Sequence, residues 1–588
     1  MRQKPPRRSS VIRLSAVLAG GLIFFTCLQP FRPLRAQDSG DDQQKVWIYL
    51  DENMLNNDDL VPLDFRQRTR NRLAKKSAVA GDYFSNVIPG NRIRAQIENY
   101  ANEIVFYSRS LKAYSAFITP SNSEKIKNLP FVKEIIPVKI YHRQISPEPA
   151  DRLEKSTKSI DFYGNSYDQL HLLNIPAVHD SGYSGAGVCI AMIDAGFYKD
   201  HTAFQHIINS GRLIAERDFI FNDNNVQDEI PGDTTSEGPQ HKHGTSVWSI
   251  VGGYVPDILI GAAYGSEFLL AKSERIGSES ILEEDLFVAA VEWADENGAD
   301  IISSSVAYRD FDYGIGDHQF EQLDGKTTNA AKVINWAFER GILPVICAGN
   351  DAQRFQQDGG LLTPSDAHGA LTVGAVDRNG QIAGFSSHGP TADGRIKPDL
   401  CALGVGVYVA MSYSPNSYMF GDGTSYSTPL IAGSAALLME RFPSLPPIKI
   451  IELLKAKSSR SSSPGDRYGW GVPNVYRSMF ETDATIFSTW EPDRERIYAL
   501  PNPAISGVTF AFRWTHVIPN KKPTPMKIYN LLGELVWSAD LLPQIAGTDE
   551  LTYWNLRNIS GEFVSSGVYF VAVKDGHTTI RGKFLVLH

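Results

Sequence analysis

Apolar runs alternate with helix-like segments through the middle of the chain, between about residues 164 and 480. Five runs are apolar at nearly every position and have the length of strands, while three longer segments repeat their apolar residues with a helical period. The predicted strands are 187–194, 268–273, 299–307, 342–349 and 370–376, and the predicted helices are 283–298, 329–341 and 428–442. Nearly continuous apolar strands separated by helices are typical of a parallel sheet covered on both faces. We therefore predict one large α/β domain over residues 160–480.

A smaller unit precedes this domain. A strand at 46–50, a pair of strands within 103–118, and a helix followed by a strand within 123–138 form an α+β pattern, with a basic helix expected at 65–77. The unit is near the lower size limit of a free-standing domain. We assign residues 37–150 to it, and the proline- and charge-rich stretch at 146–159 is expected to be an exposed linker.

The pattern changes again after Glu481. A short linker leads into a series of short strands separated by turns, at 509–514, 525–530, 552–556, 567–573 and 582–588. Short strands at this spacing are typical of a β-sandwich. We therefore predict a small β-sandwich domain over residues 495–588.

The first 36 residues have the three parts of a secretory signal peptide. Basic residues such as Arg7 and Arg8 precede a 15-residue apolar stretch at 14–28, and Ala36 offers a small residue for cleavage. The stretch is shorter than the roughly 20 residues that span a bilayer. Residues 1–36 are therefore expected to be a signal peptide, with an uncleaved anchor as the alternative.

The charge of the remaining chain excludes one class of partner. Residues 1–36 hold seven Arg and Lys and no acid, so the rest of the chain has 50 basic against 66 acidic residues. Phosphate binding needs a basic face, and nucleic acid is therefore not expected as a partner. The four cysteines are too few for a disulfide scaffold. Cys189 and Cys347 lie in apolar runs and are expected to be buried free thiols.

Three residues at the ends of predicted elements carry the candidate chemistry. Asp194 ends an apolar strand, His243 opens a helical run within His-Gly-Thr, and Ser425 lies in Gly-Thr-Ser just before an apolar helix. Parallel sheets place their sites at the carboxyl ends of the strands. A serine at a helix N-terminus is well placed for nucleophilic attack. Asp, His and Ser together supply a hydroxyl nucleophile with an oriented general base. Taken singly, each of them is more often a cap or a structural residue.

These motifs, in this order, resemble the subtilisin-like serine proteases (subtilases, peptidase family S8) over roughly residues 165–480. The resemblance also covers Ala348-Gly349-Asn350 after a strand, Lys397-Pro398-Asp399 and 468–474. It implies that Ser425 is the nucleophile, His243 the general base and Asp194 the residue that orients the histidine. It further implies that the Asn350 side chain and the backbone N–H of Ser425 form an oxyanion hole.

The same resemblance implies a substrate-binding cleft. Its two lining segments would pair with an extended peptide through backbone groups. Their predicted substrate-binding residues are Ser305, Val306, Ala307, Ala348 and Gly349. Three positions depart from the family pattern: Ala195 after the aspartate, Ala307 in place of a common glycine, and Trp248 where a small residue is usual. His241 has no assigned role and is expected to be an exposed loop residue.

No cofactor is expected for the chemistry, and the cysteines show no metal-ligand spacing. Structural calcium suits many subtilases, and the Asp- and Asn-rich loop at 221–225 is a candidate for it. The loop lacks the EF-hand spacing, which favours a solvated loop over a calcium site.

The flanking units also resemble known modules. The unit at 37–150 resembles the inhibitory, folding-assisting propeptide of subtilases, with a permanent N-terminal binding module as the alternative. The unit at 495–588 resembles the type A sorting domain of the type IX secretion system, through 500–503, 526–536 and 566–570. This implies export across both membranes of a diderm bacterium to the surface or medium. A generic surface-binding sandwich is the alternative.

The sequence therefore predicts a secreted, self-processed serine endopeptidase that acts as a monomer on polypeptides. Its expected partners are its own propeptide in cis and the type IX secretion machinery. The alternative is a catalytically silent surface-binding protein on the same scaffold. The complete set of Asp194, His243, Asn350 and Ser425 argues against that alternative.

Overall fold

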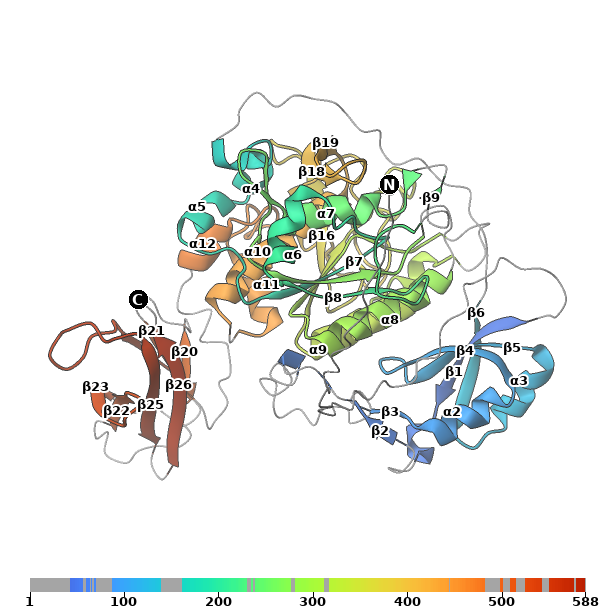
Figure 1. The fold of residues 1–588 in the computed structure, drawn as a ribbon, viewed down its shortest axis with the longest axis horizontal. Helices are drawn as coiled ribbons and strands as arrows, with labels where there is room; N and C mark the ends of the chain where they lie inside the picture. The colour runs from blue at the N-terminus through green and yellow to red at the C-terminus, as the bar shows by residue number, and fades with distance from the viewer. Residues whose placement is uncertain are drawn as a thin grey trace, which may run out of the picture.

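The structure is a computed structural model, and the elements described here are labelled in Figure 1. The predicted signal peptide, the linker after residue 138 and most of the predicted basic helix at 65–77 lie outside the described residues. The structure describes residues 43–55, 60–63, 65, 68–69, 87–138, 161–229, 234–235, 238–275, 281–310, 317–443, 445–481, 497–500, 508–513, 524–541, 549–575 and 578–586.

A parallel sheet of seven strands forms the centre of the large domain, in the order β17-β16-β15-β14-β7-β13-β8. The strands are β7 (Cys189–Asp194), β8 (Leu213–Asp218), β13 (Glu267–Lys272), β14 (Ile301–Ser304), β15 (Leu343–Cys347), β16 (Leu371–Val376) and β17 (Leu400–Leu403). All five predicted strands are present. The two edge strands β8 and β17 were not predicted, because β8 is only half-buried and polar in its second half and β17 has four residues.

Helices cover both faces of this sheet (Figure 1). Because side chains alternate along a strand, Ile190 and Met192 of β7 pack with α7 (Lys242–Gly252) and α10 (Thr424–Arg441) on one face. Ala191 and Ile193 pack on the opposite face with α8 (Ile281–Asn297) and α9 (Asn329–Glu339). Strands buried on both sides explain the nearly unbroken apolar runs. Shorter elements surround this frame, namely α4 (Tyr167–His171), α5 (Ile175–Asp180), α6 (Gln205–Asn209), β9 (Thr234–Thr235), β10 (Gly238–Pro239), β11 (Tyr254–Val255), β12 (Leu259–Ile260), β18 (Val407–Met411), β19 (Ser417–Gly421), α11 (Pro447–Ala456) and α12 (Val475–Phe480).

The N-terminal domain has an antiparallel sheet of four strands in the order β4-β5-β1-β6. Its elements are β1 (Gln44–Leu50), β2 (Leu60–Pro62), β3 (Val87–Pro89), α2 (Asn91–Glu98), β4 (Ala101–Ser108), β5 (Ala113–Ile118), α3 (Pro120–Lys127) and β6 (Val132–Val138). One sheet face packs with Ile93 and Ile97 of α2 and Ile126 of α3. The predicted α+β pattern is therefore present in the described part of the unit.

The other face of this sheet packs on the large domain. Trp47 of β1 and Leu111 belong to the same apolar core as α8 and α9. The fully buried Lys45 ammonium forms an ion pair with Asp285 of α8 at 2.5 Å. Beside it, Arg109 stacks on Trp336 of α9 with its guanidinium 4.9 Å from the ring centre. The interface between the N-terminal domain and the large domain is thus a buried apolar surface that contains ion pairs.

The C-terminal residues form two antiparallel sheets, in the orders β20-β21-β24 and β23-β22-β25-β26. The strands are β20 (Tyr498–Leu500), β21 (Val508–Arg513), β22 (Thr524–Tyr529), β23 (Leu535–Leu541), β24 (Asp549–Trp554), β25 (Gly567–Asp575) and β26 (Thr578–Val586). Phe510 and Trp554 of one sheet share a core with Phe584 of the other. This is the predicted small β-sandwich.

Two further findings concern the cysteines and the search for membrane-spanning helices. Cys189, Cys347 and Cys401 are free and buried, as predicted for the first two. Burial raises the pKa of each thiol to about 12, so all three are neutral at physiological pH. Within the described residues, no helix is both long and apolar enough to cross a membrane.

Candidate active site

Asp194 and His243 meet at the carboxyl end of the sheet. Asp194 is the last residue of β7 and is completely buried, while His243 lies in the first turn of α7. The Nδ1 atom of His243 lies 2.8 Å from Asp194 Oδ1 and 3.0 Å from Oδ2. A carboxylate oxygen only accepts, so Nδ1 carries the proton, and the neutral ring keeps its lone pair on Nε2. The backbone N–H of Ala195 donates a further hydrogen bond to Asp194 Oδ1 at 2.8 Å.

A close approach of two backbones allows this contact. A Cβ added to Gly244 would lie 2.1 Å from the carbonyl oxygen of Gly196 and 3.1 Å from the Asp194 Cβ. Real Cβ atoms do not approach a backbone oxygen so closely. Glycine after His243 therefore lets the start of α7 lie directly against the end of β7. This is the physical reason for the His-Gly-Thr motif in this chain.

Ser425 lies in the first turn of α10, one residue after the start of the helix. The preceding Gly423 has φ +154° and ψ 154°, a conformation that is essentially restricted to glycine. Helix α10 packs against α7, and the ring of Tyr426 has its centre 6.4 Å from the His243 ring. Ser425 is thus presented at a helix N-terminus, and the residue next to it, Tyr426, lies near His243. Ser425 as a whole is half-buried.

Asn350 follows β15 and faces the same turn. Its side-chain oxygen accepts hydrogen bonds from the backbone N–H of Thr424 at 2.9 Å and from the Thr424 hydroxyl at 3.0 Å. These bonds fix the orientation of the amide, so its Nδ2 group is left to donate. Thr424 was not singled out from the sequence. Its position between Gly423 and Ser425 in the motif was the signal that could have identified it.

The predicted substrate-binding segments follow the neighbouring strands β14 and β15. The Ser305 hydroxyl donates to the backbone oxygen of Ser425 at 2.9 Å, which ties the first segment to the turn of α10. Val306 and Ala307 are half-buried, whereas Ala348 and Gly349 are buried. The structure therefore places both segments next to the cluster of Asp194, His243, Asn350 and Ser425.

The structure accounts for one departure from the family pattern and corrects one expectation. Trp248 is buried on α7, where it stacks on Phe204 with ring centres 3.7 Å apart. The expectation that His241 is an exposed loop residue is wrong. It is 8% exposed, and its Nδ1 accepts a hydrogen bond from the backbone N–H of Asp228 at 3.0 Å. Its burial comes from the loop at Asp228 that folds over it, which the local pattern did not indicate.

The loop proposed for calcium has its oxygens directed at an arginine. Arg217 donates to the side-chain oxygen of Asn222 and, at 3.2 Å, to the backbone oxygen of Asp223. Among the described residues, no group of three or more His, Cys, Asp or Glu side chains is arranged to hold a metal ion. Calcium binding by this chain stays a prediction.

Comparison with protein families identifies two modules. Residues 185–471 match the subtilase family (Peptidase_S8), and residues 497–587 match the secretion system C-terminal sorting domain (Por_Secre_tail). The first match contains all four residues of the cluster. The second spans the β-sandwich.

Individual relatives agree with these matches. Bacillopeptidase F of Bacillus subtilis (strain 168) is 25% identical over 502 residues, covering 77% of this chain, which spans about a third (33%) of that relative. Subtilisin DY of Bacillus licheniformis is 27% identical over 308 residues, covering 52% of this chain and 95% of the relative. A solved protease from Pseudoalteromonas arctica PAMC 21717 has 23% identity and a TM-score of 0.42, covering 55% of this chain and 99% of the other. The chain therefore contains a subtilase domain at residues 185–471 and a C-terminal secretion sorting domain at residues 497–587.

Proposed function

We propose that this protein is a serine endopeptidase that hydrolyses peptide bonds in extended polypeptides. Ser425 Oγ attacks the scissile carbonyl, and His243 Nε2 takes its proton and later delivers it to the leaving amine. Asp194 holds the ring in the required tautomer and stabilises the imidazolium ion. Asn350 Nδ2 and the backbone N–H of Ser425 donate to the oxyanion. The chemistry needs no cofactor.

One observation carries this proposal. The buried carboxylate of Asp194 lies 2.8 Å from His243 Nδ1, and helix α10, which carries Ser425 in its first turn, packs against the helix of His243. A buried charge costs free energy unless it is paired, so the arrangement has value chiefly when the ring becomes charged. The fixed amide of Asn350 adds a donor where negative charge would develop. A surface-binding protein requires none of these features.

We further propose that the N-terminal domain is a propeptide that is removed by the enzyme itself. The domain covers α8 and α9 and leaves a chain segment at 139–160 between it and the large domain, outside the described residues. Two buried ion-pair sites hold it there, centred on Asp285 and Glu292 of α8. The mature protein acts as a monomer. The C-terminal sorting domain directs the chain to secretion.

The test compares the purified wild-type chain with Ser425→Ala, each treated with a fluorophosphonate probe and measured by mass spectrometry. We expect label on Ser425 and loss of the 37–150 segment in the wild type, with neither in the variant. A wild type that labels but keeps the segment would retain the enzyme and reject self-processing. Absence of label after limited proteolysis has removed the N-terminal domain would overturn the proposed enzyme.

A further inference from the structure

The two predicted substrate-binding segments are joined to each other a second time, beyond the sheet. The first segment, 305–307, continues into residues 308–310, and the second continues into a series of turns at 351–360, called here the turn loop. Tyr308 exchanges two backbone hydrogen bonds with Thr363, at 2.6 and 2.9 Å. The segments are therefore held by strands β14 and β15 on one side and by the contacts of residues 308–310 on the other.

Arg309 makes the side-chain part of this second connection. It is 6% exposed and donates to both carboxylate oxygens of Asp358, at 3.0 and 2.6 Å. It also donates to the backbone oxygen of Leu361 at 3.2 Å, and its guanidinium lies 3.9 Å from the centre of the Phe355 ring. A planar guanidinium that binds a carboxylate through two hydrogen bonds and stacks on a ring fixes an orientation as well as a charge. Arg309 thus holds the turn loop at a defined distance from the first segment.

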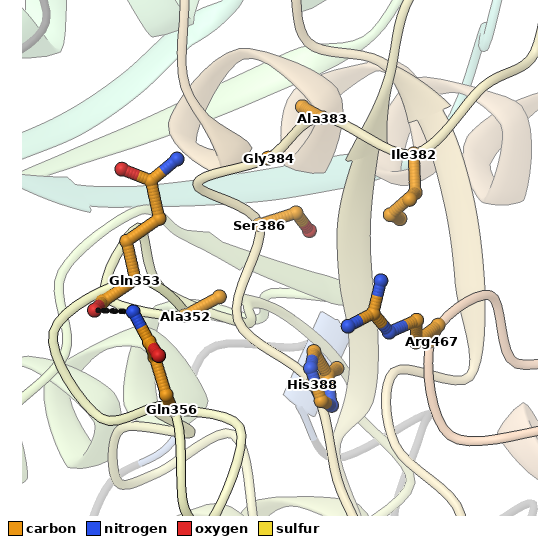
Figure 2. Close-up of a pocket in the computed structure, with 9 residues that line it drawn as sticks. All are labelled: Ala352, Gln353, Gln356, Ile382, Ala383, Gly384, Ser386, His388 and Arg467. Atoms are coloured by element: carbon orange, nitrogen blue, oxygen red, sulfur yellow. Dashed lines mark hydrogen bonds between the residues drawn. The ribbon is translucent and has the colours of Figure 1, made fainter.

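Other residues of the turn loop border open space. Ala352, Gln353 and Gln356 form one wall of a pocket of about 380 Å³, and the segment at 382–388 forms the facing wall (Figure 2). In Figure 2 the Gln356 amide donates to the backbone oxygen of Gln353, at 3.1 Å, which is a bond within the loop and not across the pocket. Atoms that border open space gain fewer packing contacts there. The contacts of Arg309 therefore carry much of the positioning of this loop.

The proposed oxyanion donor is held by different contacts. The amide oxygen of Asn350 accepts two hydrogen bonds from Thr424, at 2.9 and 3.0 Å. The next residue, Asp351, donates from its backbone N–H to the Ser387 hydroxyl at 2.9 Å. A displacement of the turn loop beyond Asp351 can therefore change the separation of the two segments while Asn350 stays in place.

We infer that Arg309 is a positioning residue for the substrate: by tying the turn loop to residues 308–310, it fixes the separation of the two segments that bind an extended peptide. The inference rests on the proposed peptidase function and adds a residue that acts on substrate binding rather than on bond cleavage. Without this tie, the loop has to be ordered each time a peptide binds, and that cost is subtracted from the binding free energy.

The test measures kcat and KM separately for one fluorogenic peptide, with enzyme purified from the full-length chain. Arg309→Met should raise KM about tenfold and change kcat less than about twofold, because the tie is lost while the reacting groups stay in place. The rate at which a fluorophosphonate probe labels Ser425 should not change, since this small probe does not bind as an extended peptide. Arg354→Met is the matched control. Arg354 pairs with Asp310 and so joins the same two stretches, but its side chain is 48% exposed, and its loss should change KM less than about twofold.

Three further variants examine the tie itself. Arg309→Lys keeps the positive charge without the two-pronged geometry, and it should raise KM about threefold. Asp358→Asn should raise KM as Arg309→Met does. The double variant should be no worse than either single variant, because all three remove the same interaction.

Each outcome decides the inference. A KM that Arg309→Met leaves unchanged, or that Arg309→Met and Arg354→Met raise equally, would overturn it while peptide hydrolysis itself stands. A parallel loss of kcat and of labelling would also overturn it, because Arg309 would then support the fold of the whole site. If Arg309→Met does not give folded protein, Arg309→Lys is judged by the same criteria. A wild-type chain that neither hydrolyses peptides nor takes the label would instead overturn the peptidase function.

Discussion

The ion pair between Lys45 and Asp285 permits a quantitative test of how the N-terminal domain is held. Lys45 is on β1, Asp285 is on α8, and their side chains are 0% and 2% exposed. In Lys45→Met the methylene volume is kept, but the Asp285 carboxylate loses its only cation among the described residues. The perturbation therefore leaves a buried charge at the interface without damaging either core.

The size of the effect follows from what remains around Asp285. Removing one partner of a buried ion pair costs about 3–5 kcal/mol. Asp285 keeps hydrogen bonds from Trp47 Nε1 at 2.8 Å and from the Ser115 hydroxyl at 3.1 Å, which places the cost at the lower end. About 3 kcal/mol corresponds to a roughly hundredfold increase in the population of the undocked state. The half-buried pair of Lys112 and Glu52 gives the contrast, because both residues belong to the N-terminal domain and more exposed pairs contribute about 1 kcal/mol or less.

Two backbone amides report docking directly. The N–H groups of Arg109 and Ser110 donate to the Glu292 carboxylate of α8 at 3.0 and 2.9 Å, so they become available for exchange when the domains separate. Hydrogen exchange is measured on the full chain carrying Ser425→Ala, which prevents self-cleavage. We expect Lys45→Met to speed exchange at these two amides about a hundredfold, and Lys112→Met to speed it less than about fivefold.

Comparison of the variants can refute this reasoning. If Lys45→Met and Lys112→Met change exchange equally, the buried ion pair does not hold the domain. The double variant Lys45→Met with Asp285→Asn removes the unpaired charge as well, and it should restore most of the protection. A double variant as unprotected as Lys45→Met alone would show that lost packing, rather than charge, causes the effect.

Three other predictions concern the large domain. Asn350→Leu should lower kcat about 10²–10³-fold with little change in KM, which is the loss known for removal of an oxyanion-hole donor in subtilisin, a subtilase. An unchanged kcat on a peptide substrate would remove Asn350 from the mechanism. Gly244→Ala should destabilise the protein by about 1–3 kcal/mol in urea unfolding because its Cβ would meet a backbone oxygen, whereas Gly465→Ala, with open space around its Cβ, should have little effect. Equal stabilities would contradict the close approach at the start of α7. Burial alone would raise the pKa of Asp399, but two lysine ammonium groups lower it to about 2. Its depressed pKa contributes roughly 2 kcal/mol of stability that is present above about pH 4 and is lost as the pH falls towards 2. Asp399→Asn should therefore cost stability at pH 6 and little at pH 2, and a cost independent of pH would refute the assignment.

Local patterns were sufficient to predict the five inner strands of the central sheet and to single out the candidate residues. Strands such as β7 are buried on both faces, so every position is apolar and the run is visible without any partner. Asp194, His243, Asn350 and Ser425 each lie at an element boundary within a short motif, which the sequence displays directly. Edge strand β8 has no such signal, because its first five residues are only half-buried and its second half is polar.

The tertiary structure alone decided which distant groups meet. The contact of His243 with Asp194 depends on the backbone approach at Gly244, and the orientation of the Asn350 amide depends on Thr424. Lys45 and Asp285 are 240 positions apart in the chain, so no local pattern relates them. The spacing of apolar residues along the sequence determines which face of a helix or strand is buried, because burial favours an apolar side chain at each position separately. Which charges and hydrogen-bonding groups share that buried space is a property of packed pairs, and it is settled only when the elements come together.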